Sequence, residues 1–127
     1  MMKRIVHILV GGSLLVAGCA FDLAHVSFTR TTLTAQSNKS FTIHEEATIE
    51  GMPCWHKRTL FKGASWNLVG TIPEGEVYKS NDQVLTVECS HIHEAYLTVS
   101  EGCVVGFYLP VERGFVKLPN PITLNVE

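Results

Sequence analysis

From Phe41 onward, apolar and polar residues alternate with a period of two, and this pattern constrains the fold more than any other feature of the chain. In the first such run, Phe41, Ile43, Ala47 and Ile49 share one side. Residues two apart point to the same face of a β-strand, so the run predicts a half-buried strand. No stretch after Cys19 repeats its apolar residues with a helical period. The sequence therefore predicts an all-β protein.

Turn residues divide the remainder of the chain into further short strands. Glycine, proline, asparagine and aspartate mark the breaks between them. The predicted strands cover residues 66–72, 76–79, 83–89, 94–99 and 103–109. Short edge strands follow within 115–126, because the prolines there cannot donate to a sheet ladder. About seven or eight strands bury alternating faces by closing on themselves. We expect a small closed or partly open antiparallel barrel or sandwich, which forms a single β domain over residues 41–127.

The first 19 residues have a charged start, an apolar middle and an end made of small residues. Met1-Met2-Lys3-Arg4 is cationic, residues 5–16 are largely apolar, and Leu15-Val16-Ala17-Gly18-Cys19 ends the segment. The apolar run is shorter than the roughly 20 residues that a membrane-spanning helix needs. This order is typical of a cleaved signal peptide rather than of a transmembrane or core helix. We expect a signal helix over residues 1–18.

The segment resembles the lipobox signal of bacterial lipoproteins, with Val16 in place of the more common leucine. The resemblance covers residues 1–19 only. It implies cleavage after Gly18, a diacylglyceryl group on the Cys19 thiol, and acylation of the new amino terminus. An anchor of several acyl chains is effectively permanent. Ala20 stands where an aspartate usually retains lipoproteins in the inner membrane, so the resemblance implies a lipid-anchored protein at the periplasmic face of the outer membrane.

The stretch that follows is polar. Residues 19–40 are rich in Thr, Ser, Gln and Asn, and we expect them to form the lipidated N terminus and a tether. Val26, Phe28 and Leu33 are spaced apolar residues within it. An edge strand formed by these residues is the alternative.

The charge of the chain excludes one class of partner. Removal of residues 1–18 from the 127 leaves 109 residues in which eight Lys and Arg face twelve Asp and Glu, a formal charge of −4. These cations are too few and too scattered to neutralise a nucleic-acid backbone. We therefore expect no nucleic-acid partner.

The cysteines predict one disulfide. If Cys19 carries lipid, an oxidising compartment contains Cys54, Cys89 and Cys103. Tight hairpins would hold Cys89 about 15–20 Å from Cys103, which is too far for a disulfide. We therefore expect that these two do not pair and that Cys54 bonds to one of them, with Cys103 preferred. Three buried free cysteines are the alternative.

A possible metal site lies in the same region, where Cys89, His91 and His93 fall within five residues. Thiolate and imidazole ligands suit zinc or copper, and a strand through Cys89 would place all three on one face. The spacing matches neither a Cys-x-x-Cys pair nor a His-Glu-x-x-His helix, and a solvated turn accounts for the same residues. A periplasmic zinc or copper protein is the alternative function.

Catalytic motifs are not evident. The sequence around Ser65 is not a G-x-S-x-G elbow, and the glutamates beside His44 fit the polar face of a strand. We expect a non-catalytic protein.

Aromatic residues indicate a partner surface. Tyr96 and Tyr108 fall on the face opposite the aliphatic residues of the same predicted strands. If the aliphatic face packs inward, Tyr78, Tyr96, Val104 and Tyr108 form an exposed patch of the kind found at interfaces. In the alternative, residues 115–126 cover them as a second layer. We expect an interaction or accessory module that binds another envelope protein.

Overall fold

The computed structural model describes residues 23–32, 39–51 and 57–127. This part of the chain is all-β and contains no helix, so the predicted fold class is confirmed. The signal helix predicted over residues 1–18, the lipidation site Cys19 and residues 20–22 lie outside the described residues.

Twelve strands, from two to ten residues long, make up the described part of the chain. They are β1 (Leu23–His25), β2 (Thr29–Arg30), β3 (Ser40–Thr42), β4 (Ala47–Ile49), β5 (Arg58–Leu60), β6 (Ser65–Ile72), β7 (Gly75–Ser80), β8 (Thr86–Glu88), β9 (Ile92–Glu94), β10 (Tyr96–Ser100), β11 (Cys103–Leu109) and β12 (Gly114–Thr123).

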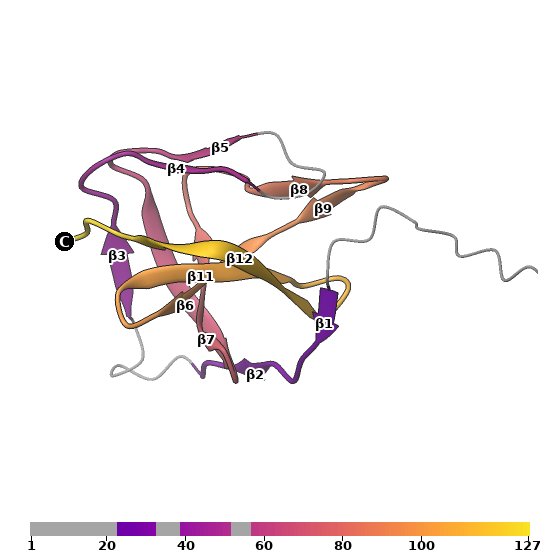
Figure 1. Cartoon of the computed structure of the whole chain (residues 1–127). Helices are drawn as coiled ribbons and strands as arrows, with labels where there is room; N and C mark the ends of the chain where they lie inside the picture. The colour runs from indigo at the N-terminus through magenta and orange to yellow at the C-terminus, as the bar shows by residue number, and fades with distance from the viewer. Residues whose placement is uncertain (1–22, 33–38, 52–56) are drawn as a thin grey trace, which may run out of the picture.

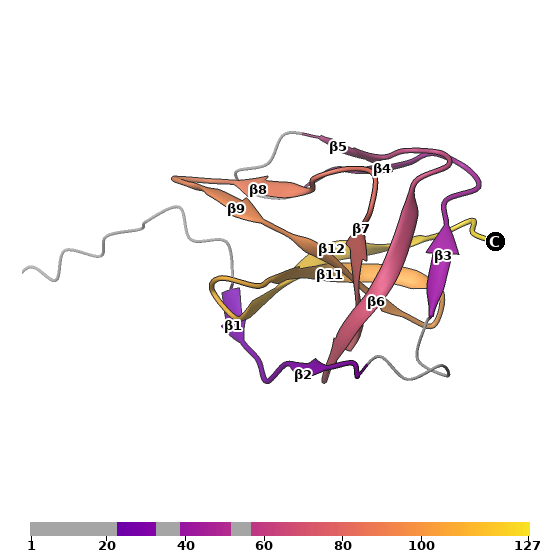
Figure 2. The same cartoon turned by 180° about the vertical axis from the view of Figure 1, so that it is seen from behind.

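The main sheet is antiparallel and runs in the order β1-β12-β11-β10-β7-β6-β2, with β3 also paired to β6. Its two edge strands, β1 and β2, are separated by residues 26–28 only. Four residue steps span at most about 14 Å. In a flat sheet, six gaps of about 4.8 Å would place the same edges roughly 29 Å apart. The sheet therefore curls into a half-barrel, and the segment through β1 and β2 crosses its open side at the bottom of Figures 1 and 2.

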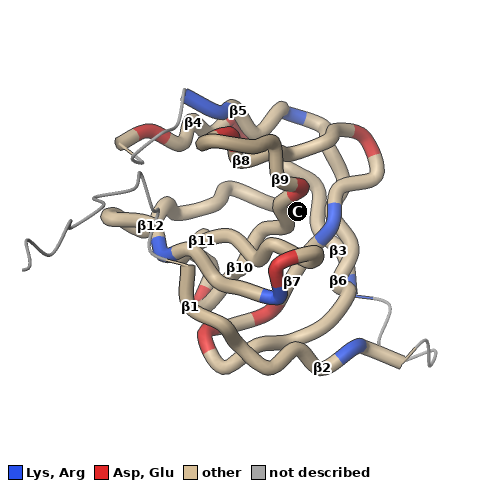
Figure 3. Tube along the Cα trace, turned by 90° about the vertical axis from the view of Figure 1, so that its right-hand side faces the viewer, with Lys and Arg blue, Asp and Glu red and all other residues tan. Residues whose placement is uncertain are grey.

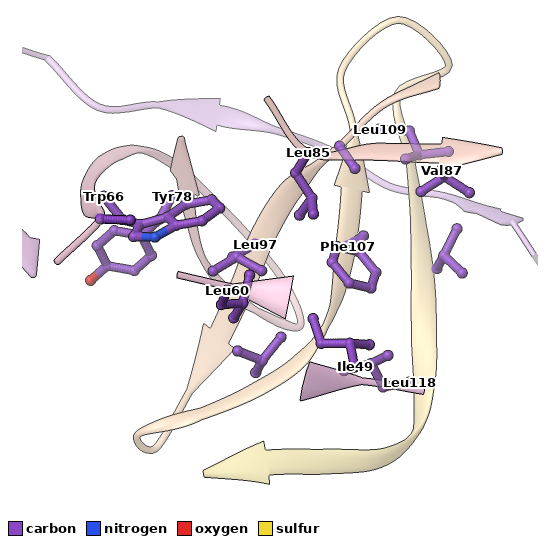
Figure 4. Packing of buried hydrophobic residues seen from close by; sticks show 14 of the residues in the cluster. Ile49, Leu60, Trp66, Tyr78, Leu85, Val87, Leu97, Phe107, Leu109 and Leu118 are labelled. Atoms are coloured by element: carbon purple, nitrogen blue, oxygen red, sulfur yellow. The ribbon is translucent and has the colours of Figure 1, made fainter. Parts of the chain in front are cut away.

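One face of the curled sheet carries the larger hydrophobic core. Trp66, Leu97 and Phe107 of the sheet pack with Ile49 of β4 and Leu60 of β5, and all five are 0% exposed. Figure 4 shows these side chains together with Val87 from β8. Fully burying one such side chain stabilises the fold by about 1.5–3 kcal/mol. The hairpins β4–β5 and β8–β9, which lie along the top of Figures 1 and 2, thus act as a cover for this core.

The segment of residues 23–31, which we call the strap, packs Val26 and Phe28 against the other face of the sheet, whereas its first residue, Leu23, packs with the larger core. Glycines in the sheet make room for its two large side chains. A Cβ atom at Gly70 of β6 would clash with the Phe28 ring, and one at Gly114 of β12 would clash with Leu23. The strap is therefore seated at both edges of the sheet by side-chain packing as well as by strand pairing.

These contacts correct the predicted organisation. The tether expected over residues 19–40 contributes β1, β2 and the first residue of β3, so the β domain begins at or before Leu23 rather than at 41. The alternative of an edge strand near Val26 and Phe28 is closer to the structure, while Leu33 lies outside the described residues.

The predicted edge strands at the C terminus form one long strand, β12. Its first residues, Gly114 to Val116, pair with both β1 and β11. The two prolines, Pro119 and Pro121, fall in residues 118–121, which the β11 register skips. A strand that continues past prolines is thus possible because they lie in a bulge, where no ladder donor is needed.

Candidate functional site

The predicted tyrosine surface is split between the two faces of the sheet. Val104 is 0% exposed and Tyr78 is 3% exposed, and both lie in the larger core. Tyr78 packs against Phe41 with ring centroids 4.8 Å apart. The exposed patch of four residues is therefore wrong.

The physical reason is register. The β11–β12 pairing shifts between Val104 and Gly106, so Val104 faces the same core as Phe107, three residues further on. Tyr78 pairs across the sheet with Leu97 and therefore shares the Leu97 face. Strict alternation along each strand predicted neither result.

Tyr96 and Tyr108 do lie opposite Leu97 and Phe107, but the strap covers them. The rings of Phe28 and Tyr108 stack with centroids 4.9 Å apart and an interplanar angle of 11°. Tyr108 is only 3% exposed, and Tyr96 is half-buried beside it. The alternative of a cover from residues 115–126 is correct only in part, since Phe115 belongs to the same cluster as Tyr108 but the overlying segment is the strap.

Between the strap and this face of the sheet lies an open hollow of about 910 Å³. Strap residues 26–28, 30 and 31 form one wall. The opposite wall comes from β6, β7, β10 and β11 and from the loop that joins β11 to β12. Its volume is within the range of pockets that hold small molecules, about 300–1,000 Å³.

Three cations line the hollow, and each comes from a different element. Arg30 lies on β2, Lys79 on β7 and Arg113 in the β11–β12 loop. None of the described lining residues is Asp or Glu. Nor is any of the three cations in an ion pair with a carboxylate of the described residues. Elsewhere along the described trace, acidic and basic positions are distributed over several strands and loops (Figure 3). The hollow thus gathers three cations that have no ion-pair partner among the described residues.

Aromatic rings form the floor beneath these charges. The Lys79 Nζ lies 5.7 Å from the centroid of the Tyr96 ring, within the range of a cation–π contact. Burial raises the pKa of Tyr108 above its ordinary value of 10.0, and the nearby charge of Arg113 opposes that rise. Tyr108 therefore stays protonated at neutral pH and places no negative charge beside Arg113.

Two contacts hold the loop that carries Arg113. The Val26 N–H of the strap donates to the Arg113 carbonyl at 3.2 Å. On the other side of the loop, His93 Nδ1 pairs with Glu112 Oε1, and both side chains are largely buried. Glu112 is therefore turned toward β9 while Arg113 lines the hollow.

The predicted metal ligands do not assemble as expected. Cys89 is disulfide-bonded, so it has no thiolate that could bind a metal. The predicted zinc or copper site therefore lacks its sulfur ligand. The His91 and His93 rings lie edge to face with centroids 6.4 Å apart. Within residues 23–32, 39–51 and 57–127, no group of three or more metal-ligating side chains is present.

The disulfide prediction is also corrected. Cys103 is a free thiol beside the Thr123 hydroxyl, so the preferred Cys54–Cys103 bond is wrong. Cys89 and Cys103 do not pair, as expected. The predicted alternative, a bond from Cys54 to Cys89, falls on Cys54, which lies outside the described residues.

Ser65, the hydroxyl considered for catalysis, is the first residue of β6 and contacts Asp82. Its Oγ lies 3.0 Å from Asp82 Oδ2, and its backbone N–H donates to the same oxygen at 2.6 Å. The arrangement joins the start of β6 to the turn after β7.

Comparison with known proteins gives no match among family models, curated proteins or solved structures. In the described part of the chain, no helix has the length and apolar character required to span a membrane.

The sequence interpretation missed the cations of the hollow. Lys79 could have been found, because it follows the inward-facing Tyr78 and so points to the Tyr96 side of the sheet. Arg30 and Arg113 are 83 positions apart, and no local pattern brings them together. Only the crossing of the strap over the open sheet does so.

Proposed function

We propose that the chain is a bacterial envelope lipoprotein, anchored through acyl chains on Cys19 after removal of residues 1–18. The support is the charged, apolar and small-residue order of the first 19 residues, with its resemblance to a lipobox. Ala20 favours the periplasmic face of the outer membrane. Lipidation of Cys19 would leave Cys54 as the partner of Cys89.

The β domain acts as a non-catalytic binding module, and its binding site is the hollow beneath the strap. One observation carries this part of the proposal: Arg30, Lys79 and Arg113 line the same hollow as three aromatic residues, and no described carboxylate lines it. Charges placed around an apolar cavity fix the orientation of a bound ligand. The nucleophile types in the described lining are the hydroxyls of Ser27, Thr31, Tyr96 and Tyr108 and the amine of Lys79, and no described histidine or carboxylate lines the hollow to activate them. Binding is therefore the chemistry that this site supports.

The anchor is tested by labelling cells that express the chain with radioactive palmitate and separating inner from outer membranes. The wild type is expected to carry label in the outer-membrane fraction, and Cys19→Ala to carry none. A wild-type chain that stays unlabelled would contradict the lipoprotein assignment.

The binding site is tested in the same cells with a photo-crosslinking amino acid at Ser27, which lines the hollow. The matched control carries it at Asn120, an exposed residue of β12 that does not line the hollow. A discrete adduct from position 27 alone supports the proposal. Equal adducts from both positions, or none from position 27, would overturn it.

A further inference from the structure

The hollow lies at the end of the domain that the proposed anchor holds. Leu23, the first residue of the strap, is four residues after Cys19. Four residues reach at most about 14 Å, so a lipid on Cys19 keeps β1 within that distance of the headgroup region. The strap then leads from β1 directly along the wall of the hollow. This step rests on the proposed lipidation of Cys19.

We infer that the hollow binds the phosphate headgroup of an anionic phospholipid in the leaflet that holds the anchor. Arg30 and Arg113 supply the planar guanidinium groups that bind phosphate oxygens in pairs. Lys79 adds a third positive charge from the opposite wall. A phosphate has several oxygens, so it can accept from donors on different sides at once.

The floor of the hollow suits the remainder of a phospholipid. The stacked Phe28 and Tyr108 rings and the Tyr96 ring beneath Lys79 present apolar surface next to the cations. Tyrosine has an apolar ring and a polar hydroxyl, and such residues favour the boundary between headgroups and hydrocarbon. The glycerol part of a lipid can lie on these rings while its phosphate meets the arginines.

The overall charge of the chain favours a local binding site over diffuse electrostatic attraction of the whole chain to an anionic leaflet. The chain after Cys19 has a formal charge of −4, so the molecule as a whole is repelled by an anionic leaflet. Three of its eight cations nevertheless line one hollow. Attraction to an anionic lipid therefore has to come from this local group.

The test is native mass spectrometry of the full-length lipoprotein, purified from membranes and released from detergent micelles. Its mass shows first whether acyl chains are present, so a failure of the lipoprotein proposal is recognised separately. Short-chain phosphatidylglycerol, short-chain phosphatidylcholine and glycerol phosphate are the three probes. The hollow variant carries Arg30→Gln, Lys79→Gln and Arg113→Gln. The control variant carries the same loss of charge at exposed lysines outside the hollow: Lys57→Gln, Lys62→Gln and Lys117→Gln.

Wild type and the control variant are expected to bind phosphatidylglycerol at least tenfold more tightly than phosphatidylcholine, and the hollow variant is expected to lose that preference. Equal loss in both triple variants would overturn the inference in favour of diffuse attraction. Glycerol phosphate bound as tightly as phosphatidylglycerol would overturn the lipid source and leave a soluble phosphate ester. If the triple hollow variant does not fold, Arg30→Glu alone is used, because Arg30 is exposed and its single change is expected to give the same loss.

Discussion

We expect the substitution Gly70→Ala to displace the strap from the sheet. The Cβ of Gly70→Ala would occupy the position of the Phe28 ring and come within 2.5 Å of the Thr29 carbonyl oxygen. Gly70 does not have the left-handed backbone conformation that disfavours alanine, so the substitution adds bulk without backbone strain. Any loss of stability therefore reports the contact between the strap and the sheet.

The magnitude follows from what Phe28 loses when it is displaced. Phe28 is half-buried, so its exposure costs about 1–2 kcal/mol, part of the roughly 1.5–3 kcal/mol for a fully buried side chain. Loss of the stack on Tyr108 adds about 0.5–1.5 kcal/mol. Alanine is more favourable than glycine inside a strand by up to about 1 kcal/mol, which offsets part of this loss. We expect a net loss near 2 kcal/mol, or roughly 8–16 °C in Tm for a domain of this size.

The assay is thermal unfolding of the purified lipoprotein, followed by near-ultraviolet circular dichroism. Thr71→Ala, at an exposed position next to Gly70, is the matched control and should change the free energy of unfolding by less than about 1 kcal/mol. Phe28→Ala removes the ring from the other side of the contact. The double variant should therefore lose less stability than the two single variants added together. A Gly70→Ala protein with wild-type Tm, or an additive double variant, would refute the seating of Phe28 on Gly70.

The remaining predictions concern side chains around the site. Glu112→Ala removes one partner of His93 and should lower the free energy of unfolding by about 1–2 kcal/mol in the same assay; an unchanged Tm would show that the contact does not hold the loop. Alkylation of the native protein should label Cys103, whereas Cys89 should be labelled only after reduction, and peptide mapping that finds Cys89 alkylated without reductant would contradict this. Burial raises the pKa of Tyr108 above 10.0, so the folded state keeps this proton longer than the unfolded state and its stability should fall as pH rises past 10. Tyr108→Phe should lessen that alkaline loss, and equal losses in both proteins over unfolding titrations from pH 8 to 12 would contradict the assignment.

Much of the fold could be predicted because alternation is a local property. The run from Phe41 to Ile49 and the later strands showed which residues fall on opposite sides, and Tyr96 and Tyr108 do lie opposite Leu97 and Phe107. Alternation does not predict the face of a side chain where the pairing register of two strands shifts. The bulge after Val104 places that side chain in the larger core. Gly106, inside the same strand, is the local sign of a bulge, and strict alternation takes no account of it.

The candidate site could not be predicted for a different reason. In the sequence, Phe28 is a single apolar residue in a polar segment. Its packing site is formed by Gly70 on another strand, which leaves space for the Phe28 ring. The same crossing brings Arg30 to Lys79 and Arg113. Such contacts depend on closure of the whole sheet, because the two edges have to approach before the strap can span them.

The most direct test of the account is the side-chain NMR spectrum of the arginines in the lipoprotein, labelled with ¹⁵N-arginine and placed in nanodiscs. After removal of residues 1–18, the chain has three arginines: Arg30, Arg58 and Arg113. Arg58 pairs with Glu88 away from the hollow and serves as the internal control. When phosphatidylglycerol replaces part of the phosphatidylcholine, the Nε–H signals of Arg30 and Arg113 should shift while that of Arg58 stays in place. Equal shifts of all three signals, or no shift of Arg30 and Arg113, would contradict a lipid-headgroup site beneath the strap.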